Sequence, residues 1–331
     1  MLRESSVVAS LAQAADLESG LRQSRRALHI NWIPCHPVAV RSLASSEAMS
    51  TDLSISSLYN IQGKIALVTG GGSGIGKMIA EGLAKNGAKV YIAARKEAQL
   101  KAAAEEINKT SAGKVDYIVA NIASKAGVDA LIAEFRKRES KLHILVNNSG
   151  ITWGAPFDNF PEAKGWDNIF AVNVKSIFYM TSGLVDLLEK DSTNADPARV
   201  INISSVAGIE AESEGSLSDA GNGVWSYNTS KAAVNHLTSQ LAITLVRRHI
   251  NVNAILPGLF PSKMTAFGFK TVGSDNFAAS QPTGRYGHTE DMAGTALFLV
   301  SPASAHVTGN HIILDGGSRL LAQRVTGQVK L

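Results

Sequence analysis

The chain has 331 residues, a formal net charge of +4, a hydrophobic content of 45% and a single cysteine. The apolar content is sufficient for a packed core, and the small, dispersed charge does not indicate binding to nucleic acid. Cys35 alone excludes an intrachain disulfide, which favours a reducing compartment such as the cytoplasm, and no apolar run reaches the length of a membrane span. His29 and His36 flank Cys35 without completing a metal-ligand set, so we expect no metal site.

Residues 1–60 form an arm that we place outside the fold. Within it, residues 19–46 contain four arginines and no acid, a composition typical of a mitochondrial transit segment. Acidic residues before position 19 argue against import. The other interpretation is a disordered arm or a misassigned start, with translation beginning at Met49. The arginines are Arg22, Arg25, Arg26 and Arg41, and the acids are Glu4, Asp16 and Glu18.

The first element of the predicted fold is an apolar run over 64–69, which is typical of a buried strand. A glycine-rich segment over 70–76 follows it, and helical periodicity follows over 77–85. Glycines allow backbone amides to approach a pyrophosphate, and a helix N-terminus favours its negative charge. This order of strand, turn and helix predicts a dinucleotide site. The expected cofactor contacts in the turn are Gly70, Gly72, Ser73, Gly74, Ile75 and Gly76.

The second predicted strand, over 88–94, indicates which nicotinamide cofactor is used. Enzymes that prefer NAD usually place a carboxylate at the end of this strand to bind the ribose 2′-hydroxyl. Here Ala94 takes that position and Arg95 follows it. Because a guanidinium matches the geometry of a phosphate, we expect Arg95 to bind the 2′-phosphate of NADP(H), in preference to NAD(H).

The remaining elements alternate between strands and helices. This alternation predicts an α/β fold: one doubly wound Rossmann-type domain with a parallel sheet of about seven strands and helices on both faces. We place this catalytic domain at 61–318 and a C-terminal tail at 319–331. The further strands are expected at 115–120, 143–147, 200–204, 251–256 and 312–315, and the helices at 125–138, within 165–190 and within 224–247.

Tyr227 and Lys231 are candidates for proton transfer. Residues four apart share one face of a helix, so the ammonium of Lys231 should lie near the phenol of Tyr227. A free phenol has a pKa near 10, and a nearby cation lowers that pKa towards the working pH. We therefore expect Lys231 to lower the pKa of Tyr227.

The glycine spacing, Thr69-Gly-x-x-x-Gly-Ile-Gly, together with Tyr227-x-x-x-Lys231 resembles the short-chain dehydrogenase/reductase family. The resemblance covers roughly residues 60–318. Further matching segments follow in the family's order: 147–150 (Asn-Asn-Ser-Gly), Asn173, 201–208 with Ser205, 257–258 (Pro-Gly), 284–287 and 315–317.

The resemblance implies a role for each catalytic residue. Tyr227 would be the general acid in reduction and the general base in oxidation. Lys231 would tune Tyr227 and bind the nicotinamide ribose, and Ser205, rather than the adjacent Ser204, would donate to the substrate oxygen. Asn173 would hold a proton-relaying water near Lys231. The cofactor contacts implied outside the glycine turn are Asn121, Ile122, Asn148, Ser149, Gly150, Tyr227, Lys231, Pro257, Gly258, Phe260 and Ser262.

The sequence departs from the family pattern at three places. Asn121 stands where the family usually has Asp, and Ser149 where it usually has Ala. The segment between Ser205 and Tyr227 is longer than usual, and the extra residues, 209–223, are acidic and rich in glycine. We expect this insertion to form a mobile flap at the rim of the site, although it could equally be a solvated loop without a role.

The implied activity is NADPH-dependent reduction of a ketone to a secondary alcohol. The sequence is similar to 3-oxoacyl-[acyl-carrier-protein] reductases, in particular to the branch linked to rhamnolipid synthesis and its fungal relatives. Sugar or polyol dehydrogenases and ketone reductases of secondary metabolism share the same motifs, so the substrate stays open. A non-catalytic regulator that binds NADP is the alternative from another class. We also expect a homotetramer or homodimer built on the helices within 165–190 and 224–247.

Overall fold

The computed structural model describes residues 52–214 and 218–321. The two interpretations of the N-terminal arm, import or a misassigned start, concern residues that lie mostly outside this range. Of the expected arm, only 52–60 is described, and it contains the short helix α2 (Ile55–Leu58). Among the described helices, none combines the length and the hydropathy needed to cross a lipid bilayer.

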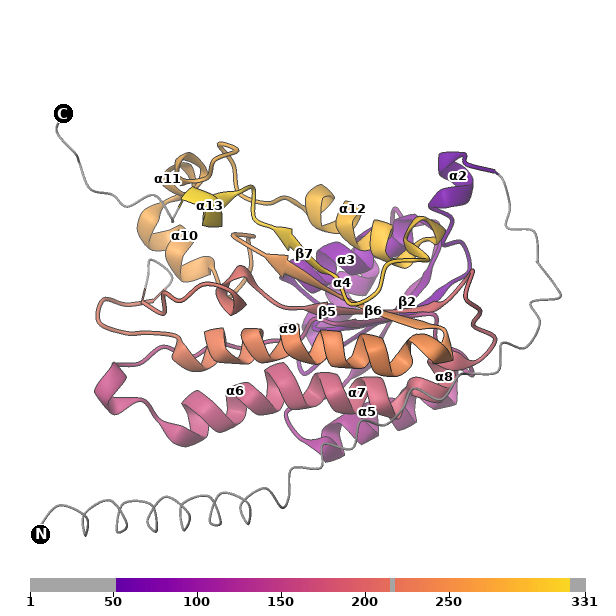
Figure 1. The fold of residues 1–331 in the computed structure, drawn as a ribbon, viewed down its shortest axis with the longest axis horizontal. Coiled ribbons are helices and arrows are strands. Elements are labelled where there is room, and N and C mark those ends of the chain that lie inside the picture. Colours follow the sequence, from indigo (N-terminus) through magenta and orange to yellow (C-terminus); the bar gives the residue numbers. More distant parts are fainter. Residues whose placement is uncertain (1–51, 215–217, 322–331) are drawn as a thin grey trace, which may run out of the picture. The chain divides into compact units, whose positions relative to one another are not determined.

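The described residues contain one parallel sheet, in which seven strands have the order β3-β2-β1-β4-β5-β6-β7 (Figure 1). The predicted fold class is confirmed, and every predicted strand is present with small shifts at its ends. The strands are β1 (Ile65–Thr69), β2 (Lys89–Ala94), β3 (Val115–Val119), β4 (Ile144–Asn147), β5 (Ala198–Ile203), β6 (Ile250–Pro257) and β7 (His311–Leu314).

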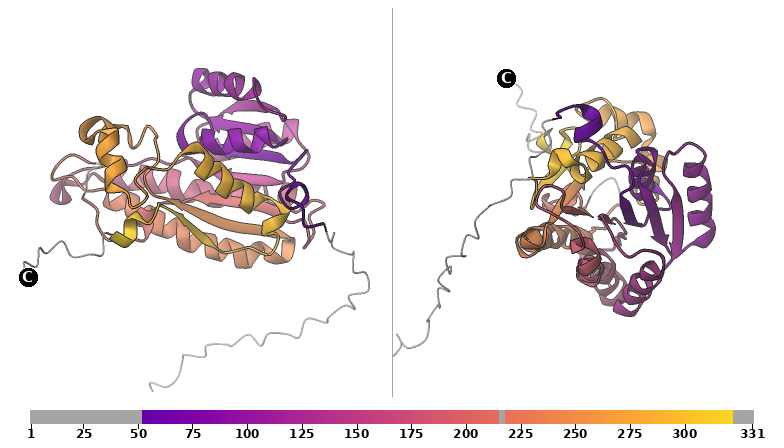
Figure 2. Two further views of the ribbon diagram at one scale, coloured as in Figure 1. Left: turned by 90° about the horizontal axis from the view of Figure 1, so that it is seen from above. Right: turned by 90° about the vertical axis from the view of Figure 1, so that its right-hand side faces the viewer.

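Helices cover both faces of the sheet (Figure 2). On one face lie α3 (Gly74–Lys85), α4 (Glu97–Asn108) and α12 (Thr289–Val300). On the other lie α5 (Lys125–Arg138), α7 (Ser176–Gly183), α8 (Val185–Glu189) and α9 (Trp225–Leu245). The remaining helices are α6 (Asn168–Phe170), α10 (Ala266–Val272), α11 (Ser274–Ser280) and α13 (Ser318–Leu321), with 3-10 turns η1 (Phe157–Asn159), η4 (Val206–Gly208), η5 (Val246–Arg248) and η6 (Pro302–Ser304).

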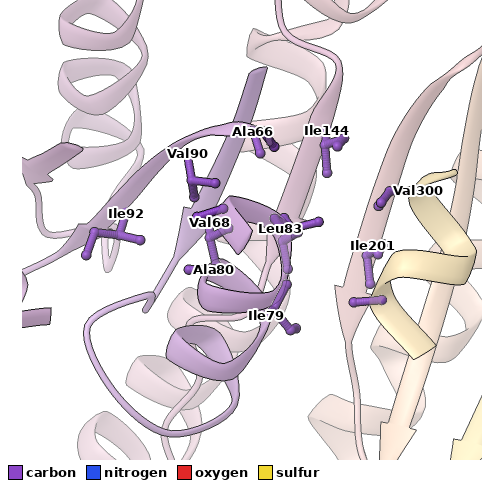
Figure 3. Packing of buried hydrophobic residues seen from close by; sticks show 14 of the residues in the cluster. Ala66, Val68, Ile79, Ala80, Leu83, Val90, Ile92, Ile144, Ile201 and Val300 are labelled. Atoms are coloured by element: carbon purple, nitrogen blue, oxygen red, sulfur yellow. The ribbon is translucent and has the colours of Figure 1, made fainter. Parts of the chain in front are cut away.

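The two faces divide the apolar residues of each strand between them. In β1, Ala66 and Val68 pack towards α3, whereas Leu67 packs into the opposite cluster (Figure 3). Because both faces are covered, the central strands read as continuous apolar runs rather than as alternating ones. Helix α3 contributes Ile79 and Leu83 at helical spacing, both fully buried.

The segment predicted to contain a long helix over 165–190 is helical but not uniform. Two π-helical turns, η2 (Glu162–Asp167) and η3 (Ala171–Lys175), lie on either side of α6, and a break at Leu184 separates α7 from α8. A π turn holds one residue more than an α turn and is frequent at functional sites. Here η3 contains Asn173, one of the predicted catalytic residues.

Apolar side chains remain exposed on α7 and α9. Phe178 is 46% exposed and Ile243 is 76% exposed. Both helices belong to the same layer over the sheet (Figure 1). We propose that this layer forms a symmetric, self-complementary contact with a second copy of the chain, in a homodimer or homotetramer.

The proposal predicts that Ile243→Glu shifts the protein to a smaller assembly, because a charge would then be buried at the contact. Light scattering at micromolar concentration measures the change. Ala102→Glu is the control, because it places the same charge at an exposed position of α4, in the opposite layer. It should leave the assembly unchanged. A wild-type protein that is monomeric under these conditions would contradict the proposal.

Candidate active site

A cleft of about 480 Å³ lies at the carboxyl ends of the strands. Its position corresponds to the point between β1 and β4 where the strand order reverses, which is where open α/β sheets bind ligands. Most of the predicted cofactor contacts line this cleft: Gly70, Ser73, Gly74, Ile75, Arg95, Asn121, Ile122, Asn148, Ser149, Gly150, Tyr227, Lys231 and Ser262.

The side chain of Thr69 joins the two turns at this point. Its Oγ1 accepts hydrogen bonds from the backbone N–H groups of Asn148 and Ser149, both at 3.0 Å. The backbone carbonyl oxygen of Thr69 accepts a hydrogen bond from Asn148 Nδ2 at 2.9 Å. The turn after β1 and the turn after β4 are thereby held together, and the cleft lies between the elements that follow them.

Gly70 and Gly76 show why the glycine turn requires residues without a side chain. Gly70 has a φ of +68°, in the left-handed region that favours glycine. A Cβ atom at Gly76 would lie 2.5 Å from the carbonyl oxygen of Gly70 and 2.3 Å from Asn148 Nδ2. Gly76 therefore lets α3 begin directly against the turn, although neither Gly76 nor Gly72 lines the cleft. At the start of α3, Ser73 makes no side-chain capping bond.

Positive charge gathers in the cleft without acidic partners. Among the described residues that line it, the charged ones are Arg95, Lys96, Lys231 and Lys263, and none is Asp or Glu. None of these four forms an ion pair within the described part of the chain. A ligand with several negative charges fits this arrangement.

Lys231 is buried inside α9, with 4% of its surface exposed. Its ammonium donates a hydrogen bond to the carbonyl oxygen of Ile203, at the end of β5, at 2.9 Å. The same nitrogen lies 5.5 Å from the centroid of the Tyr227 ring. Because burial disfavours the charged form, the pKa of Lys231 falls from its usual 10.5 to about 8.

The expected lowering of the Tyr227 pKa is not found. Burial raises the pKa of the Tyr227 phenol above 10, and a hydrogen bond with the Ser205 side chain opposes this only in part. The spacing of the two residues reflects the charge of Lys231 but not the removal of water around both groups. Desolvation is the larger effect here, because it acts on the phenol and on the ammonium together.

The two adjacent serines have different partners. Ser204 is buried, and its Oγ donates to the backbone carbonyl of Lys231 at 3.1 Å. Ser205 is only partly buried; its Oγ accepts from the Ala207 N–H at 3.2 Å and is also hydrogen-bonded to Tyr227. Ser204 lines the cleft and Ser205 does not, yet Ser205 is the serine that contacts the phenol.

Asn173 lies behind the cleft rather than in its wall. Its Oδ1 accepts from the Ile151 N–H at 2.9 Å, and its Nδ2 donates to the Ile151 carbonyl at 2.9 Å and to Ser230 Oγ at 3.0 Å. It therefore fixes the segment after β4 against α9, the helix that carries Tyr227. The role of Asn173 in holding a water stays a prediction.

Three predicted contacts at the end of β6 and just after it lie outside the lining of the cleft. Gly258 donates its N–H to the Leu314 carbonyl at 2.9 Å, and a Cβ atom there would lie 2.7 Å from Asp315 Cβ. Phe260 is buried, 2.2 Å from where a Cβ of Gly287 would lie. With Pro257, these residues anchor the segment that leads to Ser262, which does line the cleft.

The insertion 209–223 is attached to the core on both sides of residues 215–217, which lie outside the described range. On the near side, the Glu212 carbonyl accepts from Asn228 Nδ2 at 2.8 Å, and the Ser213 carbonyl accepts from the Val224 N–H at 2.8 Å. On the far side, Gly223 forms antiparallel bridges with Glu214 and Ala155. These contacts differ from those of a free flap, because they fasten its flanks to α9 and to the segment after β4.

Several lining residues were not identified from the sequence, and two of them contact each other. Gln99 and Lys263 reach the cleft from α4 and from the segment after β6. The proximity of Gln99 to Arg95 and of Lys263 to Ser262 is the only sequence signal for them, because their mutual contact joins positions 164 residues apart.

The amino-acid sequence is similar to those of known proteins. A family model described as short chain dehydrogenase matches residues 64–272. The rhamnolipids biosynthesis 3-oxoacyl-[acyl-carrier-protein] reductase of Pseudomonas aeruginosa is 42% identical over 79% of this chain and 98% of its own. The short-chain dehydrogenase/reductase PhomF of Diaporthe leptostromiformis is 32% identical over 82% and 97%.

Solved structures show the same similarity. The RhlG/NADP active-site complex of Pseudomonas aeruginosa has a TM-score of 0.73 and 41% identity, covering 79% of this chain and 98% of its own. A gluconate 5-dehydrogenase from Burkholderia cenocepacia, in complex with NADP and tartrate, has a TM-score of 0.69 and 31% identity, covering 80% and 98%.

The low pKa of Lys231 predicts a specific dependence of stability on pH. Between pH 8 and 10.5 the unfolded chain binds a proton at Lys231 that the folded chain lacks, so the free energy of unfolding rises with pH in that window. Lys231→Met removes this contribution. The difference in unfolding free energy, wild type minus variant, should therefore increase from pH 8 to pH 10. Urea unfolding of both proteins without cofactor measures it, and two parallel pH curves would refute the assignment.

Proposed function

The chain belongs to the short-chain dehydrogenase/reductase family, and from this membership we propose that it is an NADPH-dependent reductase that converts a ketone into a secondary alcohol. One observation carries the proposal. The acid-free, cationic cleft ends at Tyr227 and Lys231, with Ser205 hydrogen-bonded to the phenol. A polyanionic dinucleotide and a proton donor for a carbonyl oxygen can therefore be held side by side.

The residues of the cleft fit a nicotinamide dinucleotide. The glycine turn and the N-terminus of α3 offer backbone N–H groups for the pyrophosphate. Arg95 would bind the 2′-phosphate, and Lys231 the ribose next to the nicotinamide. When bound, NADPH supplies the hydride for the carbonyl carbon. RhlG, the similar protein from Pseudomonas aeruginosa, was solved as a complex with NADP, which supports the choice of cofactor.

The chain's own residues handle the proton. As negative charge develops on the substrate oxygen, Tyr227 transfers its phenolic proton to that oxygen. The hydroxyl of Ser205 donates a hydrogen bond to the same oxygen and stabilises its charge. Lys231 in its ammonium form stabilises the phenolate that remains, and a pKa of about 8 keeps much of it protonated at neutral pH. Reprotonation of Tyr227 through a water near Asn173 completes the cycle.

The rim of the site favours a substrate that is uncharged near the reacting carbonyl. The pKa of Glu210 is raised by burial and by repulsion from Asp315 and Glu212. These acids follow Ser205 and β7, so they disfavour anionic groups near the mouth. We infer that the substrate is a 3-oxoacyl compound or another neutral ketone, in line with the activity for which the 42% identical relative is named.

A ketone panel tests the function. NADPH oxidation is followed with a neutral 3-oxoacyl thioester, a simple aliphatic ketone and a keto sugar acid, each at several concentrations. We expect the thioester to have the highest kcat/KM and the sugar acid the lowest. Highest activity on the sugar acid would overturn the substrate class, and tight NADPH binding without turnover of any ketone would favour a regulatory protein.

Tyr227→Phe should abolish turnover while leaving NADPH binding nearly intact, because only the transferable proton is lost. Ser205→Ala should lower kcat by about 10²–10³-fold, as does the loss of one donor to a developing oxyanion. Steady-state kinetics and fluorescence titration of NADPH measure the two effects. Ser204→Ala is the comparison for Ser205, and most of the activity surviving in Tyr227→Phe would contradict the mechanism.

Arg95→Asp should erase or invert the preference for NADPH over NADH. A carboxylate repels the 2′-phosphate, whereas it accepts a hydrogen bond from the free 2′-hydroxyl of NADH. Titration of both cofactors measures the two dissociation constants. Lys101→Asp makes the same change of charge at an exposed position of α4, outside the cleft. It should leave the preference for NADPH over NADH intact. Equal affinity of the wild type for both cofactors would rule out the role of Arg95.

A further inference from the structure

We propose that Lys263 is a second cation for the 2′-phosphate of NADPH, acting with Arg95 from the opposite side of the cleft. The inference rests on the proposed function, because it assigns a further residue to the same cofactor site. Both side chains line the cleft, Arg95 from the end of β2 and Lys263 from the segment that follows β6.

The turn that carries Lys263 is held in place by the residues around it. The Ser262 N–H donates to Thr265 Oγ1 at 2.9 Å, and the Thr265 N–H donates to Ser262 Oγ at 3.2 Å. Thr265 Oγ1 also donates to the carbonyl of Phe260 at 2.8 Å, and Phe260 is buried. The backbone at Lys263 is therefore fixed, and only its side chain is free to choose a partner.

This turn lies directly against the glycine turn. A Cβ atom at Gly74 would be 3.2 Å from Ser262 Cβ. From there the ammonium of Lys263 reaches α4 and donates to Gln99 Oε1 at 2.8 Å. Gln99 in turn donates from Nε2 to the carbonyl of Gly72 at 3.0 Å. The chain of contacts places the ammonium above the first turn of α4, the helix that begins just after Arg95.

The hydrogen-bond partner of the Lys263 ammonium in the structure is the neutral amide of Gln99, and no ion pair of Lys263 is found among the described residues. An ammonium bonded to a phosphate makes a charge-assisted hydrogen bond, roughly twice as strong as a neutral one. Lys263 is exposed, so it keeps most of its hydration in either state and loses little on exchanging partners. A 2′-phosphate beside Arg95 is thus a better partner for Lys263 than the amide of Gln99.

A contact with the pyrophosphate instead would have a different consequence. NADH and NADPH share the pyrophosphate, whereas only NADPH has the 2′-phosphate. Binding of both cofactors therefore separates the two possibilities. The position of the ammonium at Gln99 on α4, rather than at the N-terminus of α3, favours the 2′-phosphate.

The test is titration of NADPH and NADH with wild type, Lys263→Ala and Lys263→Arg. Lys263→Ala should raise the dissociation constant of NADPH by about tenfold, the range of one hydrogen bond to a charged group. The dissociation constant of NADH should change by less than about twofold. Lys263→Arg should keep the NADPH affinity close to that of the wild type. Lys270→Ala, an exposed lysine at the end of α10 that does not line the cleft, is the matched control and should change neither.

The inference is overturned if Lys263→Ala weakens the binding of both cofactors equally, or if it does not weaken the binding of NADPH. A wild type with no preference for NADPH overturns the proposed cofactor choice as well, whatever the variants do. A wild type that prefers NADPH and a Lys263→Ala variant with the same preference refute the role of Lys263 alone. Thermal melting of each variant confirms that the fold is retained.

Discussion

The site depends on the hydrogen bonds of Thr69 at the point where the strand order reverses. Neighbouring parallel strands diverge into separate turns at their carboxyl ends, and nothing in the sheet itself holds those turns together. The hydroxyl of Thr69 accepts from two N–H groups of the turn after β4. With no Cβ at Gly76, α3 can begin beside this junction. The floor of the cleft, the start of α3 and the turn after β4 therefore have one fixed geometry.

Helix α9 is fixed against the same sheet by a chain of buried polar side chains. Asn147 Nδ2 donates to Asn202 Oδ1 at 2.9 Å, and Asn202 Nδ2 donates to Thr238 Oγ1 at 3.0 Å. These hydrogen bonds join β4 to β5 and β5 to α9. Buried polar groups are costly unless they are paired, so this arrangement specifies one position of α9 relative to the strands. Tyr227 and Lys231 lie on that helix, so these hydrogen bonds also position the proposed proton donor.

Charge divides the site into two ends. The lining of the cleft holds cations without acidic partners among the described residues, whereas Glu210, outside that lining, is close enough to Asp315 and Glu212 for their charges to raise its pKa. Under the proposed function, this distribution of charge would direct the phosphates of the cofactor and the substrate to different ends. Lys231 lies between the two ends as a buried ammonium that is easily deprotonated.

The amino-acid sequence by itself determined the order of strands and helices, the glycine turn and the pairing of Tyr227 with Lys231. These follow from local rules: buried strands read as apolar runs, tight turns require glycine, and residues four apart share a helix face. Only the tertiary structure decided the pKa of Tyr227, the attachment of the insertion and the contact of Lys263 with Gln99. Burial and hydrogen bonds between residues distant in sequence control these properties. A linear pattern does not show which groups lose their contact with water or which distant residue becomes their hydrogen-bond partner.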